Sequence, residues 1–465
     1  MISPLNSPLL QTAICLLLAG CATSPKPSPA PDIVVPKAWS AAPVASTGAP
    51  EAWLNDFDSP ELAPLVSEAL VHNADLHSAA ARFAQSIAEA RIAGADQLPS
   101  VGLGLNGTRQ KISSFGPTST GGIRFDNYDL ALNLGWELDL WGQLRNRTSA
   151  ALALVEGSQA ELRGARLSLA AQVSKSWFNY SEAQQQLALA QRTAQAYAEN
   201  LKTFEARYRR GLSEGLDLRR IRTQSASAEA EVQSRRRALD YAARSLEILL
   251  GRYPAANIAS TATLPELPKA IPSGLPADLL NRRPDLITAE RRLAAVDKEL
   301  SATRKDLLPK ISLTTSGGSS SQEFNNLLDS DFSIWSLGAN LTQPIFQGGR
   351  ILANIDRSKA LREQATANYR STALRAFLEV ESTLAAERFL QNEHAHLARA
   401  AKEATATEQI AWDRYRNGTT DFINVLDTQR TANASRSRLL AIRNLLLQNR
   451  IDLYLALGGP FEPES

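Results

Sequence analysis

Apolar and polar residues alternate along four short stretches of this chain. In 130–141 every second residue is apolar, and the residues between them are mostly small or polar. Shorter stretches with the same period begin at Val101, Ile311 and Leu337. This period puts apolar side chains on one face of a β-strand and polar side chains on the other. Such strands are typical of a membrane barrel with lipid outside and water inside, and also of a soluble sheet with one buried face.

Two long spans without proline, 118–253 and 345–459, predict long helices, because proline breaks a helix interior. Within the first span, residues 150–207 are rich in Ala, Leu, Gln, Glu and Arg, which all favour helix. This segment alone would form a rod of roughly 85 Å. A rod of that length does not fit inside one compact globule, so we expect a coiled-coil shaft.

The two halves of the chain carry the same motifs in the same order, about 210 residues apart, which predicts an internal duplication. We assign residues 51–260 to a first repeat and 261–465 to a second, each with an equatorial helix, two strands and a long helical hairpin. The recurring pairs include Leu98-Pro99 with Leu308-Pro309, Tyr208-Arg209-Arg210-Gly211 with Tyr415-Arg416-Asn417-Gly418, and Leu250-Gly251 with Leu457-Gly458.

The strand count limits how the sheet closes. Four strands cannot form a barrel, since about eight are needed even for one filled by side chains. Open sheet edges cannot face hydrocarbon, because each unpaired backbone group costs several kcal/mol. The strands of one chain must therefore close with those of other chains, and three chains would leave a lumen. The loops 107–126 and 317–334 are expected to form polar tips on the outer side.

The chain begins with an apolar segment that ends in Leu18-Ala19-Gly20-Cys21. It is too short for a membrane-spanning helix and is typical of a lipoprotein signal, so we expect a signal peptide over 1–20. Cleavage would leave Cys21 to carry acyl chains, followed by a tether up to residue 50 that is rich in Pro, Ala and Ser. Ala22 after the cysteine fits sorting to the outer membrane. An ordinary buried cysteine is the alternative.

Composition excludes several classes of function. The net charge is +2 and no basic patch contains aromatic residues, so a nucleic-acid partner is not expected. With four His, one Met and only the signal-segment Cys15 besides Cys21, neither a metal site nor a disulfide is predicted. The run Gly211–Gly215 fits the Gly-x-Ser-x-Gly pattern of hydrolases, but it lies between two predicted helices rather than after a strand. We expect no enzyme.

Several longer motifs are specific in combination. They are Leu18-Ala19-Gly20-Cys21, Trp53 with Phe57-Asp58-Ser59-Pro60-Glu61-Leu62, Asn281-Arg282-Arg283-Pro284-Asp285-Leu286, Gln343-Pro344-Ile345-Phe346 with Gly348-Gly349-Arg350, and the two Tyr-x-x-Gly turns. Through these motifs the chain, from Cys21 to Pro460, resembles the TolC-like outer-membrane factor family, in its lipoprotein branch of RND-type efflux channels.

The resemblance implies an α+β membrane protein that works as a homotrimer. Each chain would give four strands to a twelve-stranded transmembrane β-barrel, which continues into a twelve-helix periplasmic α-barrel of coiled coils. The implied partners are outer-membrane lipid, a periplasmic adaptor (a membrane fusion protein) and an inner-membrane RND-type pump. No cofactor is implied, apart from the diacylglycerol and the N-acyl chain on Cys21.

On spacing, Gly211 and Gly418 suit a chain reversal between two helices, where a positive φ is needed. The resemblance adds that these two tips are the surface that the adaptor binds. A plain helix–helix turn remains at least part of the explanation.

Just beyond the second turn, the spacing puts Ile423 and Asp427 on one helix face. By position, Ile423, Asn424 and Asp427 match the family's periplasmic gate. A trimer would then hold a ring of isoleucines and, one turn on, a ring of carboxylates that attracts cations. On spacing alone, Asp427 could equally be an ordinary solvated residue. The resemblance also assigns Tyr415 and Asp217 to the contacts that lock neighbouring helices in the closed state.

The sequence therefore predicts a passive, gated exit duct in the outer membrane of a Gram-negative bacterium, extending into the periplasm. It would pass drugs or other small toxic compounds from the adaptor and the pump to the exterior. One alternative is the outer-membrane duct of a type I protein-secretion system. A more remote alternative is a structural coiled-coil lipoprotein that spaces two membranes.

Overall fold

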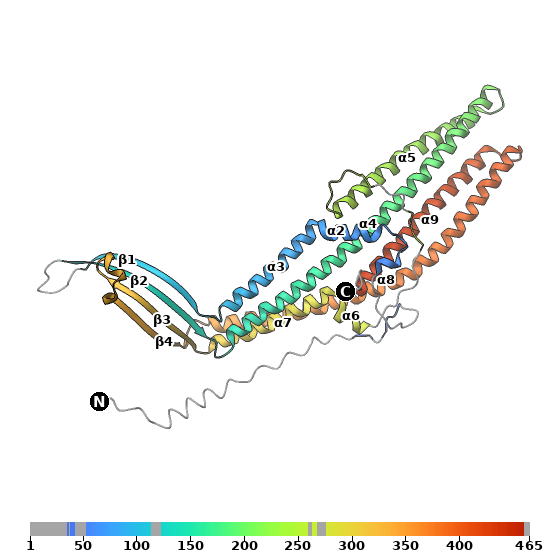
Figure 1. Cartoon of the computed structure of the whole chain (residues 1–465). Coiled ribbons are helices and arrows are strands. Elements are labelled where there is room, and N and C mark those ends of the chain that lie inside the picture. The colour runs from blue at the N-terminus through green and yellow to red at the C-terminus, as the bar shows by residue number, and fades with distance from the viewer. Residues whose placement is uncertain are drawn as a thin grey trace. The chain divides into compact units, whose positions relative to one another are not determined.

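The structure, a computed structural model, describes residues 35–36, 38–41, 53–112, 122–258, 263–266 and 276–459 (Figure 1). The predicted signal peptide 1–20 and Cys21 lie outside the described residues, as does most of the predicted tether. Contacts between residues divide the chain into two compact units. Unit 1 includes Glu89–Ala153 and Leu293–Ala367, and unit 2 includes Val34–Ala88, Leu154–Arg292 and Asn368–Ser465.

The described elements repeat one pattern of helix, strand pair and helical hairpin. Their order is η1 (Trp53–Asp56), α2 (Leu62–His72), α3 (Ala74–Ala95), β1 (Ser100–Ile112), β2 (Ile123–Leu138), α4 (Gln143–Arg209), α5 (Gly215–Leu249), α6 (Pro276–Arg282), α7 (Pro284–Arg304), η2 (Lys305–Leu307), β3 (Lys310–Ser321), η3 (Phe324–Leu328), η4 (Ser330–Phe332), β4 (Ser333–Thr342), α8 (Arg350–Arg416) and α9 (Phe422–Leu457).

Unit 1 holds one antiparallel sheet in which the strands follow the chain order β1-β2-β3-β4 (Figure 1). The register brings Leu103, Leu132, Gly317 and Trp335 into one row across the sheet. Because directly opposed residues share a face, the apolar positions of all four strands lie on one side. Trp335 is 83 % exposed and Leu103 is 73 % exposed, so the described residues leave this part of the apolar face uncovered. The four predicted strands are confirmed.

The predicted loop boundaries in this sheet were wrong. β1 continues to Ile112 and β2 begins at Ile123, so much of 107–126 is strand. β3 continues to Ser321, and η3 and η4 fill most of the remainder of 317–334. The strands are longer than predicted because their backbone hydrogen bonds continue into segments with polar side chains. The apolar alternation therefore marks only part of each strand.

β2 ends at Leu138, earlier than the alternation over 130–141 predicts. The reason is Asp139, whose carboxylate accepts hydrogen bonds from the backbone N–H groups of Leu144 (3.1 Å) and Arg145 (2.8 Å). These donors belong to the first turn of α4 and have no partner within the helix. The side chain therefore starts the helix and stops the strand.

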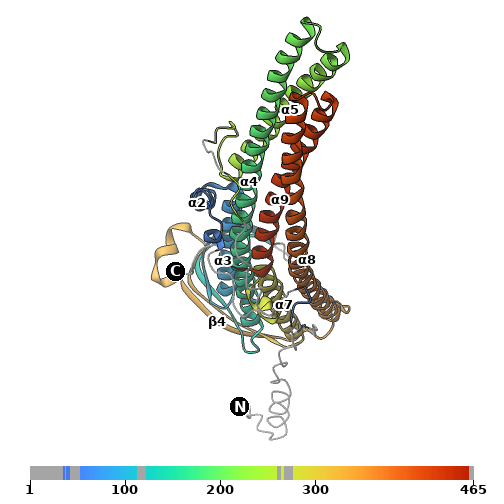
Figure 2. The same ribbon diagram turned by 90° about the vertical axis from the view of Figure 1, so that its right-hand side faces the viewer.

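Two long helical hairpins, α4–α5 and α8–α9, confirm the predicted duplication. α4 and α8 each contain 67 residues, and α5 and α9 contain 35 and 36. In unit 2 the two hairpins run alongside each other (Figure 2). Among the helices of the described residues, none combines the length and the apolar character needed to cross a bilayer.

Aromatic residues are few, but several gather in the core of unit 2. Trp53 is fully buried and stacks on Tyr454 of α9 with ring centroids 5.4 Å apart. Trp177 of α4 donates a hydrogen bond from its indole nitrogen to the Ser59 hydroxyl (3.0 Å). The short segment around η1 and α2 is thereby packed onto both hairpins. Each such aromatic ring buries a large apolar area, so this cluster contributes to the packing between the hairpins.

The Asn-Arg-Arg-Pro-Asp-Leu motif joins three helices in unit 2 through Arg283. Its guanidinium pairs with Asp285 of α7 (2.8 Å) and Glu379 of α8 (2.7 Å), and it donates to the Ala456 carbonyl of α9 (3.0 Å). The Arg283 side chain is only 10 % exposed. A hydrogen bond to a charged group is stronger than one between neutral groups, and all three partners depend on this one side chain.

We expect Arg283→Ala to lower the free energy of unfolding by about 2 kcal/mol, because a mostly buried guanidinium loses its polar contacts with all three partners. The thermal midpoint measured by far-UV circular dichroism would fall accordingly. The matched control is Arg282→Ala, since Arg282 is exposed and should change stability by less than about 0.5 kcal/mol. Equal shifts in the two variants would contradict the assignment.

The second prediction compares two adjacent glycines in β3. A Cβ atom on Gly318 would lie 2.0 Å from the Leu130 carbonyl oxygen, whereas a Cβ on Gly317 would meet nothing within 4 Å. Gly318→Ala should force β2 and β3 apart at a cost of about 1–3 kcal/mol, and Gly317→Ala should be tolerated. The measurement is the amount of folded protein in the outer-membrane fraction. Equal yields for both variants would refute the close strand contact.

Candidate functional site

The turns that end α4 and α8 have the same backbone structure. Gly211 has φ +73° and Gly418 has φ +70°. In the first turn the Gly211 N–H donates to the Tyr208 carbonyl (2.9 Å), and in the second the Gly418 N–H donates to the Tyr415 carbonyl (3.0 Å). In both, the next N–H donates to the carbonyl five residues back, which is a Schellman motif. Nothing lies within 4 Å of a Cβ built on either glycine, so the positive φ alone requires glycine.

Both turns lie at the same end of unit 2 (Figures 1 and 2). An aromatic cluster just below them joins the hairpins. Phe204 of α4 lies 3.9 Å from Phe422 of α9 and stacks on Tyr415 of α8 at 5.9 Å, both measured between ring centroids. Trp412 packs edge-on to Tyr415 at 6.1 Å. Phe204 and Phe422 are each only 2 % exposed, so the cluster fixes the spacing of the hairpins near their tips.

Phe204, Trp412 and Phe422 were not among the residues predicted for this site. The i, i+3 spacing of Trp412 and Tyr415 was a signal for a shared helix face. No local signal pairs Phe204 with Phe422, because they lie in different halves of the chain.

Tyr415 occupies the position that the resemblance assigned to the closed-state lock. Its ring is half-buried, and the Arg207 guanidinium lies 5.8 Å from the ring centroid. Burial raises the pKa of the Tyr415 phenol; the Arg207 charge opposes this and the Asp217 charge adds to it. The hydroxyl therefore stays neutral and able to donate. Asp217 itself lies near Arg220 (3.7 Å), and the described residues include no hydrogen bond between Asp217 and Tyr415.

The matching tyrosine of the first half, Tyr208, has a different environment. It is 47 % exposed, and its ring approaches Gly215 at the start of α5 rather than joining the aromatic cluster. The two halves therefore share a backbone turn but not the side-chain contacts around it.

The three predicted gate residues lie together on an exposed side of α9. Ile423 is 43 % exposed, and the Asn424 amide donates to the Thr420 hydroxyl (3.0 Å). Asp427 is exposed as well, one turn further along. The buried side of the same helix faces the aromatic cluster through Val425. Among the described residues, no buried apolar cluster includes the exposed side.

Asp427 is paired with a residue that the sequence analysis missed. The Arg430 guanidinium lies 2.8 Å from the Asp427 carboxylate, and the two side chains are 71 % and 62 % exposed. Their i, i+3 spacing was visible in the sequence. A gate ring built from this helix would therefore carry an arginine beside each carboxylate, so its charge is mixed rather than purely negative.

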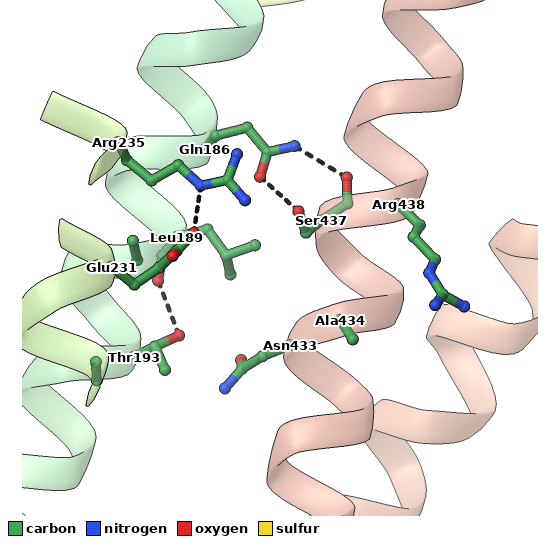
Figure 3. A pocket seen from close by; sticks show the side chains of 11 residues that line it. Gln186, Leu189, Thr193, Glu231, Arg235, Asn433, Ala434, Ser437 and Arg438 are labelled. Atoms are coloured by element: carbon green, nitrogen blue, oxygen red, sulfur yellow. Dashed lines mark hydrogen bonds and ion pairs between the residues drawn. The ribbon is translucent and has the colours of Figure 1, made fainter. Parts of the chain in front are cut away.

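A groove separates the hairpins about midway along unit 2, with a cavity of about 370 Å³ (Figure 3). Gln186 of α4 bridges it at one end: its amide nitrogen donates to the Ser437 carbonyl (2.9 Å) and its amide oxygen accepts from the Ser437 hydroxyl (2.8 Å). Arg235 on α5 pairs with Glu231 (2.6 Å), and Arg438 also lines the groove. The cavity is a gap between coiled coils, lined by Leu189 and three alanines as well as by polar side chains, several of which bind each other.

Neither a metal centre nor a hydrolase is supported. Across the described residues, no group of three His, Cys, Asp or Glu side chains is placed to hold a metal ion. The Gly-x-Ser-x-Gly run joins α4 to α5, so Ser213 follows a helix and not the strand that a nucleophile elbow needs.

Comparison with known proteins identifies the family. Residues 65–252 and 275–459 match the family described as Outer membrane efflux protein. The chain is 33 % identical to the pyoverdine export outer membrane protein OpmQ of Pseudomonas putida, over 97 % of this chain and 98 % of that protein. It is 30 % identical to SilC of Salmonella typhimurium, described as a probable outer membrane lipoprotein, over 97 % and 98 % of the two chains.

A solved structure of the outer-membrane channel OprN superposes on this chain with a TM-score of 0.85, at 28 % identity, over 93 % of this chain and 99 % of the other. The predicted resemblance, the TolC-like fold with duplicated halves and the outer-membrane location are thereby confirmed. The expectation of a channel rather than an enzyme is confirmed by the family itself. The chain belongs to the outer membrane efflux protein family and is the outer-membrane channel of an efflux pump.

Proposed function

We propose that three copies of this chain assemble into one duct, gated at the helix tips, that exports small toxic compounds. The observation that carries the proposal is the sheet of unit 1, which has an apolar face, a polar face and two open edges, β1 and β4. In hydrocarbon an open edge is untenable, because its N–H and C=O groups would lose their hydrogen bonds. Closure with the strands of two further copies gives a twelve-stranded barrel with the polar face around the lumen.

The gate would be the ring formed by Ile423, Asn424 and Asp427 on the exposed side of α9. Isoleucine narrows a pore without binding ions, and the Asp427 carboxylates attract cations. The adjacent Arg430 reduces that attraction. Tyr415 and Asp217 would hold the closed arrangement through contacts between neighbouring helices.

The tips at Gly211 and Gly418 would be the docking surface for a periplasmic adaptor, which connects the duct to an inner-membrane RND-type pump. The chain contains no phosphate-binding loop, so the energy for transport must come from that pump. Two exposed turns with one backbone structure in each chain would give six similar contact points in a trimer.

The attachment to lipid and the repeat boundaries remain proposals. We propose that Cys21 carries the diacylglycerol and N-acyl chain, supported by the description of SilC as a probable lipoprotein, and that the repeats run over 51–260 and 261–465. Barrel insertion already holds the protein in the membrane, so the acyl chains would act as an additional anchor.

The cargo is not set by similarity, since the relatives' names include pyoverdine, cations and toluene. A polar lumen lined by Asn, Ser, Thr and Gly side chains selects weakly, so selection would reside in the pump. Among the earlier alternatives, family membership favours efflux over protein secretion and over a purely structural role.

The proposal is tested first by a susceptibility panel on a deletion strain and its complemented parent, covering dyes, detergents, antibiotics, organic solvents and toxic metals. We expect hypersensitivity to amphiphilic compounds, restored by complementation, because the pump loses its exit. If the deletion strain is harmed only because a protein toxin accumulates in it, and its susceptibility to the small molecules is unchanged, the secretion duct would be favoured.

A gate variant cycle tests the assignment of Asp427 and Arg430 in planar bilayers. Asp427→Ala should lower the cation-to-anion permeability ratio and Arg430→Ala should raise it, each about two- to fivefold, as expected for solvent-exposed charges worth up to about 1 kcal/mol. The double variant, which removes both charges, is the matched control and should lie between them. If all three variants keep the parent's conductance and ion preference, this helix face does not line the constriction.

A further inference from the structure

The apolar face of the sheet changes character toward the β1–β2 hairpin. Leu105 of β1 lies opposite Leu130 of β2, and the next residue of β2 on this face is Tyr128. Phe324 of η3 packs edge-on against Tyr128 with ring centroids 5.7 Å apart. Aromatic side chains at the rim of an apolar band are typical of the level where lipid headgroups begin. The aromatic pair therefore marks the edge of the hydrocarbon region on this face.

Beyond this aromatic pair the same face is cationic. Arg109 lies opposite Asp126, with 3.3 Å between the guanidinium and the carboxylate. The next opposed pair on this face is Lys111 with Arg124, two exposed positive side chains directly across the ladder. Like charges in this position repel and destabilise a hairpin unless an anion lies between them.

Among the residues that the structure describes, no carboxylate neutralises this pair. Neither Lys111 nor Arg124 has an ion-pair partner among the described residues, and the connecting residues 113–121 contain no Asp or Glu. The Lys111 side chain lies over Gly122, where a Cβ atom would come within 2.6 Å of its Cε atom. The register therefore places two cations side by side at the end of the sheet, while the nearby carboxylate of Asp126 is paired with Arg109.

This end of the sheet faces the exterior. The chain enters β1 from α3 at Ser100 and leaves β2 for α4 after Leu138, so the helices that extend into the periplasm join the opposite end. In an outer-membrane channel the β1–β2 hairpin then lies at the outer leaflet.

We propose that Lys111 and Arg124, assisted by Arg109, bind the phosphate groups of phosphorylated lipid headgroups in the outer leaflet. A phosphate has several anionic oxygens and can accept hydrogen bonds from two or three cations at once. A lipid fits the whole face, because its acyl chains can cover Leu105 and Leu130 while its headgroup reaches the cations. The apolar, aromatic and cationic residues follow one another along this face in the same order as the parts of a lipid. A free anion would need only the cations, so this arrangement favours a lipid as the ligand.

The test uses the full-length channel, purified in detergent and titrated with lipid A, an acylated diglucosamine that carries two phosphates. Native mass spectrometry reports the apparent affinity. In Lys111→Gln/Arg124→Gln we expect that affinity to fall about 25-fold, since each of the two basic residues near an anionic lipid surface contributes about fivefold. Dephosphorylated lipid A should bind the parent as weakly as phosphorylated lipid A binds this variant.

Two further variants make the result specific. Lys310→Gln/Arg350→Gln removes the same charge from exposed residues at the other end of the sheet and should leave the affinity within about twofold of the parent. Lys111→Arg/Arg124→Lys keeps both charges and should keep the binding.

Three outcomes would overturn the proposal. The first is equal affinity for lipid A in Lys111→Gln/Arg124→Gln and the parent. The second is displacement of the lipid by millimolar inorganic phosphate, which would make this a general anion site. The third is earlier heat dissociation of the same variant than of the Lys310→Gln/Arg350→Gln control in lipid-free detergent, which would assign these cations to a contact between subunits.

Discussion

Backbone hydrogen bonding in hydrocarbon is the constraint on which this structure depends. Each chain supplies a sheet of four strands whose inner pairs are satisfied and whose outer strands, β1 and β4, each leave one edge open. Water could satisfy those groups, but lipid cannot, and each unpaired group would cost several kcal/mol. The exposed apolar face around Leu103 and Trp335 is a consequence of the same design, because its partner is the membrane rather than another part of the chain.

The helical hairpins are held together at three levels by different chemistry. A buried aromatic core around Trp53 and Tyr454 joins them deep in unit 2, a reciprocal amide–hydroxyl contact joins them midway, and an aromatic cluster joins them near the tips. The midway level is the least filled of the three, since a cavity lies beside its polar contact, whereas Phe204 and Phe422 near the tips are again only 2 % exposed. Regions with fewer buried contacts open at lower free energy, so the midway level is the weakest of the three joints between the hairpins.

Duplication gave both hairpins one backbone design, and side-chain divergence gave them different contacts near the tips. Tyr415 joins the aromatic cluster, whereas its counterpart Tyr208 stays exposed. Only α9 presents the exposed face with Ile423 and the Asp427–Arg430 pair. A mixed pair moderates the field at that face, since each carboxylate has a guanidinium at hydrogen-bonding distance.

The sequence by itself determined whatever depends on local periodicity. Alternation located the four strands, proline-free runs located the long helices, and the Tyr-x-x-Gly spacing located both turns. The tertiary structure decided how far β1 continues, because the ladder extends beyond the apolar positions to Ile112. It also decided which distant side chains meet: Phe204 with Phe422 near the tips, and Arg283 with three helices. Such partners are chosen by packing between segments far apart in the chain, and a local pattern carries no record of them.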